Sequence, residues 1–238
     1  MSASGARAAD RPELSIILPV HNDGDYVADV VTSYETVLAR LGRSYELLLV
    51  TNACTDRSVN ICAGLARENP CVEHIDLPQG GWGRAVRAGL RACSGEMICY
   101  TNLARTSAPT LGLLLAYNLA FPDVVVKASR KVRDNWKRRL GSLIYNLECR
   151  ALFDVAVWDV NGTPKVFPRS FGRLMAVSRD DDLIDAEFVA ICRREGYPVV
   201  DVPVIFTGRH GGRSTTRYSS AVRMYLGALS LYRALRAT

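Results

Sequence analysis

The sequence has no long apolar run. Its best, Leu111 to Phe121, is interrupted by Gly112 and Asn118 and falls short of the roughly 18–20 residues that a membrane-spanning helix needs. The polar residues 1–12 lack the apolar core of a signal peptide, so we expect a disordered tail there. Three histidines and seven cysteines, an odd number without a C-x-x-C pair, argue against a zinc site or a disulfide framework. These absences indicate a cytoplasmic protein without a transmembrane segment.

The charge of the chain is unevenly distributed, because basic residues are concentrated in its second part. Residues 1–126 carry 10 basic and 13 acidic side chains, whereas residues 127–238 carry 20 basic and 11 acidic ones. The segment 127–139 alone has seven basic residues against Asp134, and no acidic residue follows Thr207. Such a block indicates a phosphate or an anionic lipid as partner, or else a solvated helix face. Nucleic acid is not an expected partner, because no known nucleic-acid-binding module accompanies the charge.

Short apolar segments alternate along the chain with segments of helical periodicity. The segments that predict strands are 14–20, 46–50, 72–77, 96–101, 124–129 and the stretch after Gly196; those that predict helices are 25–41, 55–66, 82–93, 109–119, 133–153, 180–195 and 219–236. This alternation predicts an α/β fold, with a mostly parallel sheet flanked by helices on both faces. The segment 159–169, which contains two prolines, is rich in turn residues.

We expect one domain over residues 13–208, followed at 209–238 by a basic loop and a C-terminal amphipathic helix. The helix carries apolar and aromatic residues on one side and Arg223, Arg233 and Arg236 on the other. Two positions stay open for it. It can lie on an anionic membrane surface or pack on the domain's own sheet.

Polar segments follow three of the predicted strands, at 19–23, 51–56 and 102–106. Because ligands of such sheets bind beyond the carboxyl ends of the strands, these segments predict one shared site. Gly81 and Gly83 form only a fragment of a dinucleotide-binding fingerprint, since the third glycine is missing. They are expected to let a helix begin close to a ligand.

Several segments occur in a familiar order: P-V-H-N-D, V-T-N-A-C-T-D-R-S, G-W-G-R-A, T-N-L-A-R-T, S-R-K-V-R and D-V-N-G-x-P-K-V-F-x-R. Over roughly residues 13–208 they resemble the dolichol-phosphate mannosyltransferase branch of family-2 glycosyltransferases. The resemblance implies a GT-A fold and inverting transfer of a sugar from a nucleoside-diphosphate sugar to a polyprenyl phosphate. The composition of the C-terminal helix allows peripheral contact with an anionic membrane surface. The basic loop 209–213 resembles a flexible segment of the family and is expected to be either a lid over phosphates or a disordered segment.

The resemblance also assigns site residues. The nucleotide-sugar contacts that it implies are Pro19, His21, Asp23, Thr51, Asn52 and Asn102. Among these, Asp23 matches a ribose ligand, His21 can stack on the base and Asn52 can read a base edge. Arg84 matches a cation near the diphosphate, and Arg130, Lys131 and Arg133 match positions that face the lipid phosphate.

The sequence departs from the family where the family has its metal-binding Asp-x-Asp. Asn102, Leu103 and Ala104 stand there, and Arg105 follows. The leaving diphosphate gains negative charge, which a divalent ion normally stabilises. We therefore hypothesise that Arg84 and Arg105 stabilise the leaving diphosphate directly. Neither a divalent ion, such as Mg²⁺ or Mn²⁺, nor another cofactor is expected.

The acceptor decides whether a base is needed. A phosphate acceptor already carries negative charge and needs positioning, whereas a hydroxyl acceptor needs a base, for which Asp159 is the candidate. Asp159 can equally be a turn residue before Asn161 and Gly162. Two alternative functions remain: transfer to a soluble small molecule, and a catalytically silent binding protein of the same fold. We expect Asp180–Asp182 to cap a helix, while Asp185 and Glu187 match an acidic segment of the family.

Overall fold

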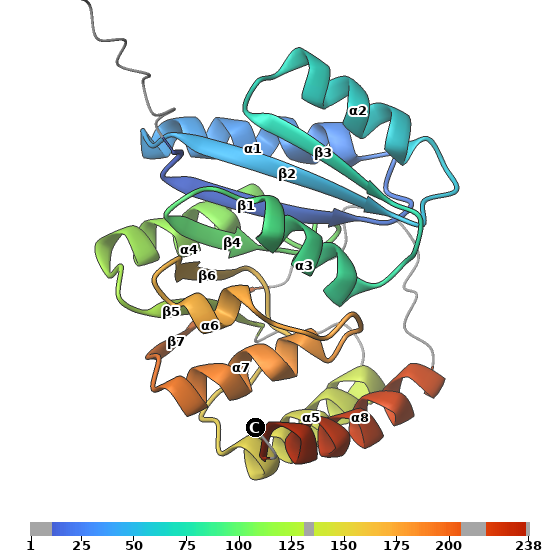
Figure 1. Ribbon diagram of the computed structural model, residues 1–238, viewed down its shortest axis with the longest axis vertical. Coiled ribbons are helices and arrows are strands. Elements are labelled where there is room, and N and C mark those ends of the chain that lie inside the picture. Colours follow the sequence, from blue (N-terminus) through green and yellow to red (C-terminus); the bar gives the residue numbers. More distant parts are fainter. Residues whose placement is uncertain (1–10, 131–135, 206–217, 237–238) are drawn as a thin grey trace, which may run out of the picture.

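The computed structural model describes residues 11–130, 136–205 and 218–236. Seven strands in these residues form one sheet in the order β3-β2-β1-β4-β6-β5-β7 (Figure 1). The strands are β1 (Leu14–Val20), β2 (Tyr45–Asn52), β3 (Val72–Leu77), β4 (Met97–Tyr100), β5 (Val125–Arg130), β6 (Lys165–Pro168) and β7 (Val199–Val204). All neighbours are parallel except β6, which is antiparallel to both β4 and β5. The predicted α/β fold with a mostly parallel sheet is confirmed.

Helices cover both faces of the sheet (Figure 1). On one face lie α1 (Val27–Leu41), α2 (Ser58–Glu68) and α4 (Ala108–Ala120); on the other lie α3 (Trp82–Ala92), α6 (Gly172–Met175) and α7 (Ile184–Glu195). The remaining pair, α5 (Trp136–Phe153) and α8 (Tyr218–Arg236), pack side by side next to α7. Each face therefore has its own apolar core, with β1 and β2 buried between the two.

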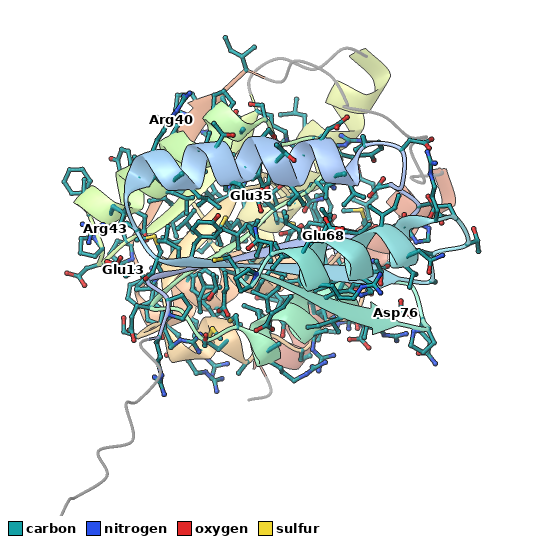
Figure 2. All side chains as sticks on the ribbon, turned by 90° about the horizontal axis from the view of Figure 1, so that it is seen from above. Glu13, Glu35, Arg40, Arg43, Glu68 and Asp76 are labelled. Carbon is teal, nitrogen blue, oxygen red and sulfur yellow. The ribbon has the colours of Figure 1, made fainter. Side chains whose placement is uncertain are left out.

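Figure 2 shows α1 and α2 next to each other over the sheet. Glu13 and Arg43, which form an ion pair at 2.7 Å, mark the edge where β1 and β2 begin. Asp76 of β3 marks the opposite edge, where the parallel strands end. The polar segments identified in the sequence gather at this second edge, as the parallel topology requires.

Local residues explain where several helices begin and end. Gly42 and Gly196 adopt left-handed conformations, with φ of 64° and 70°, and end α1 and α7. Ser107 caps α4, because its hydroxyl accepts a hydrogen bond from the Thr110 amide at 3.3 Å. The predicted stop at Gly196 is confirmed.

The strand β6 was not predicted. It lies inside the turn-rich segment 159–169 and is only four residues long. Its pairing with β4 and β5 comes from residues more than 35 positions away along the chain, so no local pattern marks it.

The C-terminal helix α8 packs on other helices. Ala228 and Leu231 are buried, and the rings of Tyr225 and Tyr145 of α5 lie 5.9 Å apart at a T-shaped angle. An added Cβ at Gly227 would collide with Leu183, just before α7. The helix therefore covers α5 and the start of α7, and the domain boundaries at 13–208 and 209–238 remain a prediction. Within the described ranges, no helix combines the length and the apolar character needed to cross a bilayer.

Candidate functional site

The end of β2 is tied to the end of β1 and to the start of α3. Asn52 donates from Nδ2 to the carbonyl of Val20 at 2.8 Å and accepts from the amide of Gly81 at 3.2 Å. His21 donates from Nδ1 to the carbonyl of Asn52 at 2.7 Å. The structure thus brings His21 and Asn52 together as predicted. The amide of Asn52 is engaged on both sides by main chain, so its main contribution is to fix this edge of the sheet.

Asp23 lies in the loop after β1 and is almost fully buried. Its carboxylate accepts from the Tyr26 hydroxyl and, at 3.2 Å, from the His21 amide. Its own amide donates to the Ser58 hydroxyl at 2.9 Å, at the start of α2. Asp23 therefore lies beside His21, and it also fixes the shape of this loop.

Pro19 and Thr51 lie within the strands β1 and β2, and both are buried. The hydroxyl of Thr51 donates to Asp76 at 2.7 Å and lies 2.9 Å from Nε2 of His74, both on β3. Since side chains alternate along a strand, Thr51 faces the opposite side of the sheet from Asn52. The geometry favours a role in joining β2 to β3 over the predicted contact with a base.

An open cleft of about 470 Å³ lies at the start of α3 and is lined by Gly80, Gly81, Arg84, Ser178, Arg179, Asp180 and Asp181. The amide of Arg84 donates to the carbonyl of Asp180 at 2.9 Å, and its guanidinium pairs with the Asp180 carboxylate at 3.1 Å. Arg87 pairs with the same carboxylate. Slight burial acts to raise the pKa of Asp180, but the hydrogen bonds from Arg84 and Arg87 lower it below its ordinary value.

The glycines at the start of α3 make room for a loop of the protein itself. An added Cβ at Gly83 would collide with the carbonyls of Arg179 and Asp181, and one at Gly81 would meet the carbonyl of Asp180. Gly81 also lines the cleft, so the expectation that these glycines let a helix begin close to a ligand stays a prediction. The expectation that Asp180–Asp182 cap a helix is corrected, because the N-cap of α7 is Leu183 and no side chain caps this helix. Asp181 accepts from the Leu183 amide at 3.2 Å, just before α7, whereas Asp180 pairs with the two arginines.

A second pocket, small and more enclosed, lies where β4 and β5 end. It has a volume of about 20 Å³ and is lined by Arg105, Ser107, Thr110, Arg130, Thr163, Val204 and Ile205. Ser107 and Thr110 are at the beginning of α4, where main-chain amides favour negative charge. We call these lining residues the arginine pocket. It brings Arg105 and Arg130 together, while Arg84 lines the cleft at α3.

The guanidinium of Arg130 is fixed by Asp159. Both carboxylate oxygens accept from it, at 2.7 Å from Nε and 2.8 Å from Nη2, and the Arg130 amide donates at 3.0 Å. The side chains are 16% and 4% exposed. Burial opposes the charge of Arg130, but the hydrogen bonds and the charge of Asp159 outweigh it and raise its pKa.

This pairing bears on the role predicted for Asp159. A carboxylate held on both oxygens by a guanidinium is a poor proton acceptor, so the geometry speaks against a general base. The carbonyl of Asp159 accepts from the Gly162 amide at 2.8 Å, which matches the alternative of a turn residue. Lys131 and Arg133, predicted beside Arg130, lie outside the described residues, as does the loop 209–213.

The position of the missing Asp-x-Asp does not fit a divalent ion. Leu103 and Ala104 are buried, and the buried Oδ1 of Asn102 has no hydrogen-bond partner among the described residues. The described part of the chain also holds no group of three or more His, Cys, Asp or Glu residues that could bind a metal. The carbonyl of Asn102 accepts from the amides of Arg105 and Thr106, at 3.1 and 3.0 Å, and so shapes the turn that carries Arg105.

Sequence reasoning missed three charged residues behind the site, Lys127, Lys165 and Asp201, which form two ion pairs together with Asp185. Lys127 pairs with Asp201 at 2.8 Å, and Lys165 pairs with Asp185; both lysines are fully buried. Asp185 also accepts from the Tyr100 hydroxyl at 2.9 Å and from Trp82 at 3.1 Å. The available signal was a lysine inside an apolar strand, in V-V-V-K-A-S and again in P-K-V-F.

The two acidic residues that matched the family segment accept hydrogen bonds from within the protein. Asp185 is the shared acceptor just described. Glu187 accepts from the amide and hydroxyl of Ser178, at 2.9 and 2.6 Å, and from the amide of Arg179 at 2.9 Å. Both are buried, and Glu187 holds the loop that lines the cleft at α3.

Known structures share this fold. Glucosyl-3-phosphoglycerate synthase from Mycobacterium tuberculosis, in complex with Mn²⁺, UDP and glucosyl-3-phosphoglycerate, superposes with a TM-score of 0.70 at 14% identity, over 94% of this chain and 79% of that chain. A mannosyltransferase from Pyrobaculum calidifontis, in complex with GDP-Man and Mn²⁺, gives 0.58 at 18% identity, over 96% and 65%. These similarities show the GT-A fold.

Sequence comparison identifies similar proteins that have been named. An undecaprenyl-phosphate 4-deoxy-4-formamido-L-arabinose transferase from Pseudomonas paraeruginosa is 24% identical over 170 residues, which are 70% of this chain and 50% of that protein. The chain thus spans about half the length of the curated relatives it matches. The family described as glycosyl transferase family 2 matches residues 15–171, from β1 through β6 and well over half of the sequence. The chain therefore belongs to glycosyl transferase family 2.

Proposed function

We propose that the protein transfers a sugar, with inversion, from a nucleoside-diphosphate sugar to a polyprenyl phosphate. The observation that carries this proposal is the arginine pocket, which Arg105 and Arg130 both line, together with Ser107 and Thr110 at the start of α4. Two guanidinium groups, hydroxyls and a helix start suit a phosphate group. Membership of family 2 and the named relative, a transferase acting on undecaprenyl phosphate, support the same reaction class.

The proposed reaction is one displacement. An oxygen of the acceptor phosphate forms a bond to the anomeric carbon, while the bond from that carbon to the diphosphate breaks and its electron pair leaves with the nucleoside diphosphate. The acceptor phosphate is already ionised near neutral pH, so no proton has to be removed from it. This chemistry is compatible with an Asp159 carboxylate that is occupied by Arg130.

Most of the predicted site residues have a place in this scheme. His21, Asp23 and Asn52 hold the nucleoside at the ends of β1 and β2. Arg84 lies at the cleft beside them and Arg105 at the arginine pocket, so the donor extends from the first to the second. Arg130, with Lys131 and Arg133, holds the acceptor phosphate.

We further propose that the diphosphate leaves without help from a divalent ion. The solved structures described above contain Mn²⁺, but the donor set at Asn102–Ala104 does not suit one. Arg105 is in position to supply positive charge near the transferred group, because it lines the same pocket as Arg130.

A membrane surface is the proposed location of the acceptor. Leucine and isoleucine side chains are exposed on the pair of helices α5 and α8: Leu143, Ile144, Leu147, Leu226 and Leu229. Exposed apolar side chains on helices within a basic region fit the interface of an anionic bilayer. The protein would then act at the inner face of the membrane, as a peripheral enzyme.

The test is transfer of radiolabelled sugar to undecaprenyl phosphate, in vesicles with anionic lipid, from a panel of UDP- and GDP-sugars with and without EDTA. We expect lipid-linked product in both conditions. Arg105→Ala should lower kcat/KM about 100-fold or more, because it removes a charge that stabilises the leaving group. Arg91→Ala, an exposed arginine in the last turn of α3, is the control and should leave the rate unchanged.

The alternatives give different results. Binding of a nucleoside diphosphate without transfer to any acceptor would identify a catalytically silent protein. Transfer only to soluble acceptors, without co-sedimentation with the vesicles, would identify the small-molecule alternative. Loss of activity in EDTA, restored by Mn²⁺, would reject the metal-independent step.

A further inference from the structure

Charged and polar side chains form a row across four strands behind the arginine pocket. In the sheet register, Lys165 of β6 lies opposite Tyr100 of β4 on one side and Lys127 of β5 on the other, and Lys127 lies opposite Asp201 of β7. The two lysines are fully buried, and each has its own carboxylate, Asp201 for Lys127 and Asp185 for Lys165.

Burying these charged side chains costs free energy, which suggests that they serve a function. Burying an ammonium group requires that it be paired and hydrogen-bonded, and an apolar residue of similar volume is often at least as stabilising. The residues before Lys127 on β5, Val125 and Val126, are fully buried and apolar, as is usual for a buried strand. The contacts of Lys127 indicate the function of its buried ammonium group.

Lys127 and Asp201 together hold the segment that carries Asp159. The Lys127 ammonium donates to the carbonyl of Asp159 at 2.6 Å and to Oδ1 of Asp201 at 2.8 Å. The other oxygen of Asp201 accepts from the amide of Trp158 at 3.1 Å. The ion pair of Lys127 and Asp201 is therefore hydrogen-bonded to the main chain of two consecutive residues, Trp158 and Asp159, in a loop without regular secondary structure.

Asp159 connects this loop to the arginine pocket. Its carboxylate binds the guanidinium of Arg130 through two hydrogen bonds, so the position of Arg130 depends on the position of the loop. Arg130 also lines the arginine pocket. The contacts form one continuous series from Asp201 through Lys127 and Asp159 to Arg130.

We propose that Lys127 and Asp201 are positioning residues, which act through Asp159 to hold the Arg130 guanidinium in place for an acceptor phosphate. They do not themselves contact the substrate. The inference rests on the proposed function for the identity of the ligand, and on the geometry alone for the effect on Arg130.

The experiment compares Lys127→Met and Asp201→Asn with Lys165→Met. The last variant removes an equally buried lysine of the same row, whose ion pair is with Asp185 and not with Asp201. The first readout is hydrogen exchange of the Arg130 Nε–H by NMR, assigned with Arg130→Lys. The second is the affinity for undecaprenyl phosphate in detergent micelles.

We expect Lys127→Met and Asp201→Asn to speed exchange at Arg130 and to weaken binding by about tenfold or more each, since small displacements of a binding group have effects of this order. Lys165→Met should change neither by more than about twofold. If Lys127→Met does not fold, Asp201→Asn decides, because Asp201 is partly exposed and asparagine keeps an oxygen for the Trp158 amide.

Two results would overturn the inference. One is folded Lys127→Met or Asp201→Asn protein with unchanged exchange and affinity; the other is an equal effect of Lys165→Met on Arg130. If the unaltered protein does not bind undecaprenyl phosphate, the proposed function fails, while exchange at Arg130 still decides whether Lys127 and Asp201 position it.

Discussion

Arg84 and Arg105 show what a sequence can reveal about single residues and what it cannot. Both were predicted near the site, and both lie at the edge where the strands end. Their distribution over two pockets could not be predicted, because the guanidinium of Arg84 is directed by Asp180, a residue 96 positions further along the chain. The ion pair of Arg130 with Asp159 has the same origin, since a long-range contact decides that Asp159 is a partner of the arginine.

Asp180 forms ion pairs with two arginines: Arg84, which lines the cleft at α3, and Arg87. Replacing it by asparagine removes one negative charge near Arg84 and Arg87, so we expect Asp180→Asn to bind UDP or GDP more tightly. Because these groups are partly exposed, the gain is roughly two- to fivefold and should shrink as salt increases. Isothermal titration calorimetry at two salt concentrations measures it.

Asp181→Asn is the matched control for this measurement. Asp181 lies on the same loop but pairs with Arg179, so its substitution should change the affinity less. Equal gains in both variants would mean that net charge, rather than release of Arg84 and Arg87, determines binding. Weaker binding by Asp180→Asn would mean that the carboxylate is needed to shape the cleft.

The helices and the long strands were predicted from periodicity, and their boundaries agree within a few residues. The strand 72–77 matches β3, and the helix 82–93 matches α3 to within one residue. The short strand β6 was missed, because its four residues are identified only by their partners on β4 and β5. The packing of α8 on α5 could likewise not be predicted. An amphipathic pattern shows that one face of a helix is buried, but it does not show which element covers that face.

Two glycines inside helices should respond oppositely to alanine. Gly64 of α2 has open space where a Cβ would be, so Gly64→Ala should raise the free energy of unfolding by about 0.5–1 kcal/mol through helix propensity. At Gly89 of α3 a Cβ would collide with the buried Ile17 of β1, so Gly89→Ala should lower it by about 1–3 kcal/mol. Urea unfolding followed by circular dichroism gives both values. A stabilised Gly89→Ala would contradict the close approach of α3 to the sheet.

The two apolar cores on either side of the sheet enclose most of the cysteines. All seven are free thiols: Cys62, Cys93, Cys99, Cys149 and Cys192 are buried, whereas Cys54 and Cys71 are partly exposed. Burial raises the pKa of Cys62, Cys149 and Cys192 to about 12, which leaves almost no reactive thiolate near neutral pH. Thiol reactivity therefore reports on the integrity of both cores at once.

Titration of the native protein with Ellman's reagent at pH 8 should modify Cys54 and Cys71 first, and the other five only on unfolding in urea. Cys54→Ser should remove one of the two early equivalents. A third thiol that reacts as fast as these two would show that one of the cores opens in the native state.

The loop 178–181 has a consequence for how much of the chain acts as a unit. The match to family 2 ends at residue 171, yet the carbonyl of Asp180 accepts from the Arg84 amide in the first turn of α3, and Asp185 accepts hydrogen bonds from Trp82 of α3 and Tyr100 of β4. The homologous segment is therefore not autonomous. Any chimaera that transplants residues 15–171 of this protein must carry the segment through α7 with them, and recombination points between family members are better placed after Gly196 than at the end of the shared sequence.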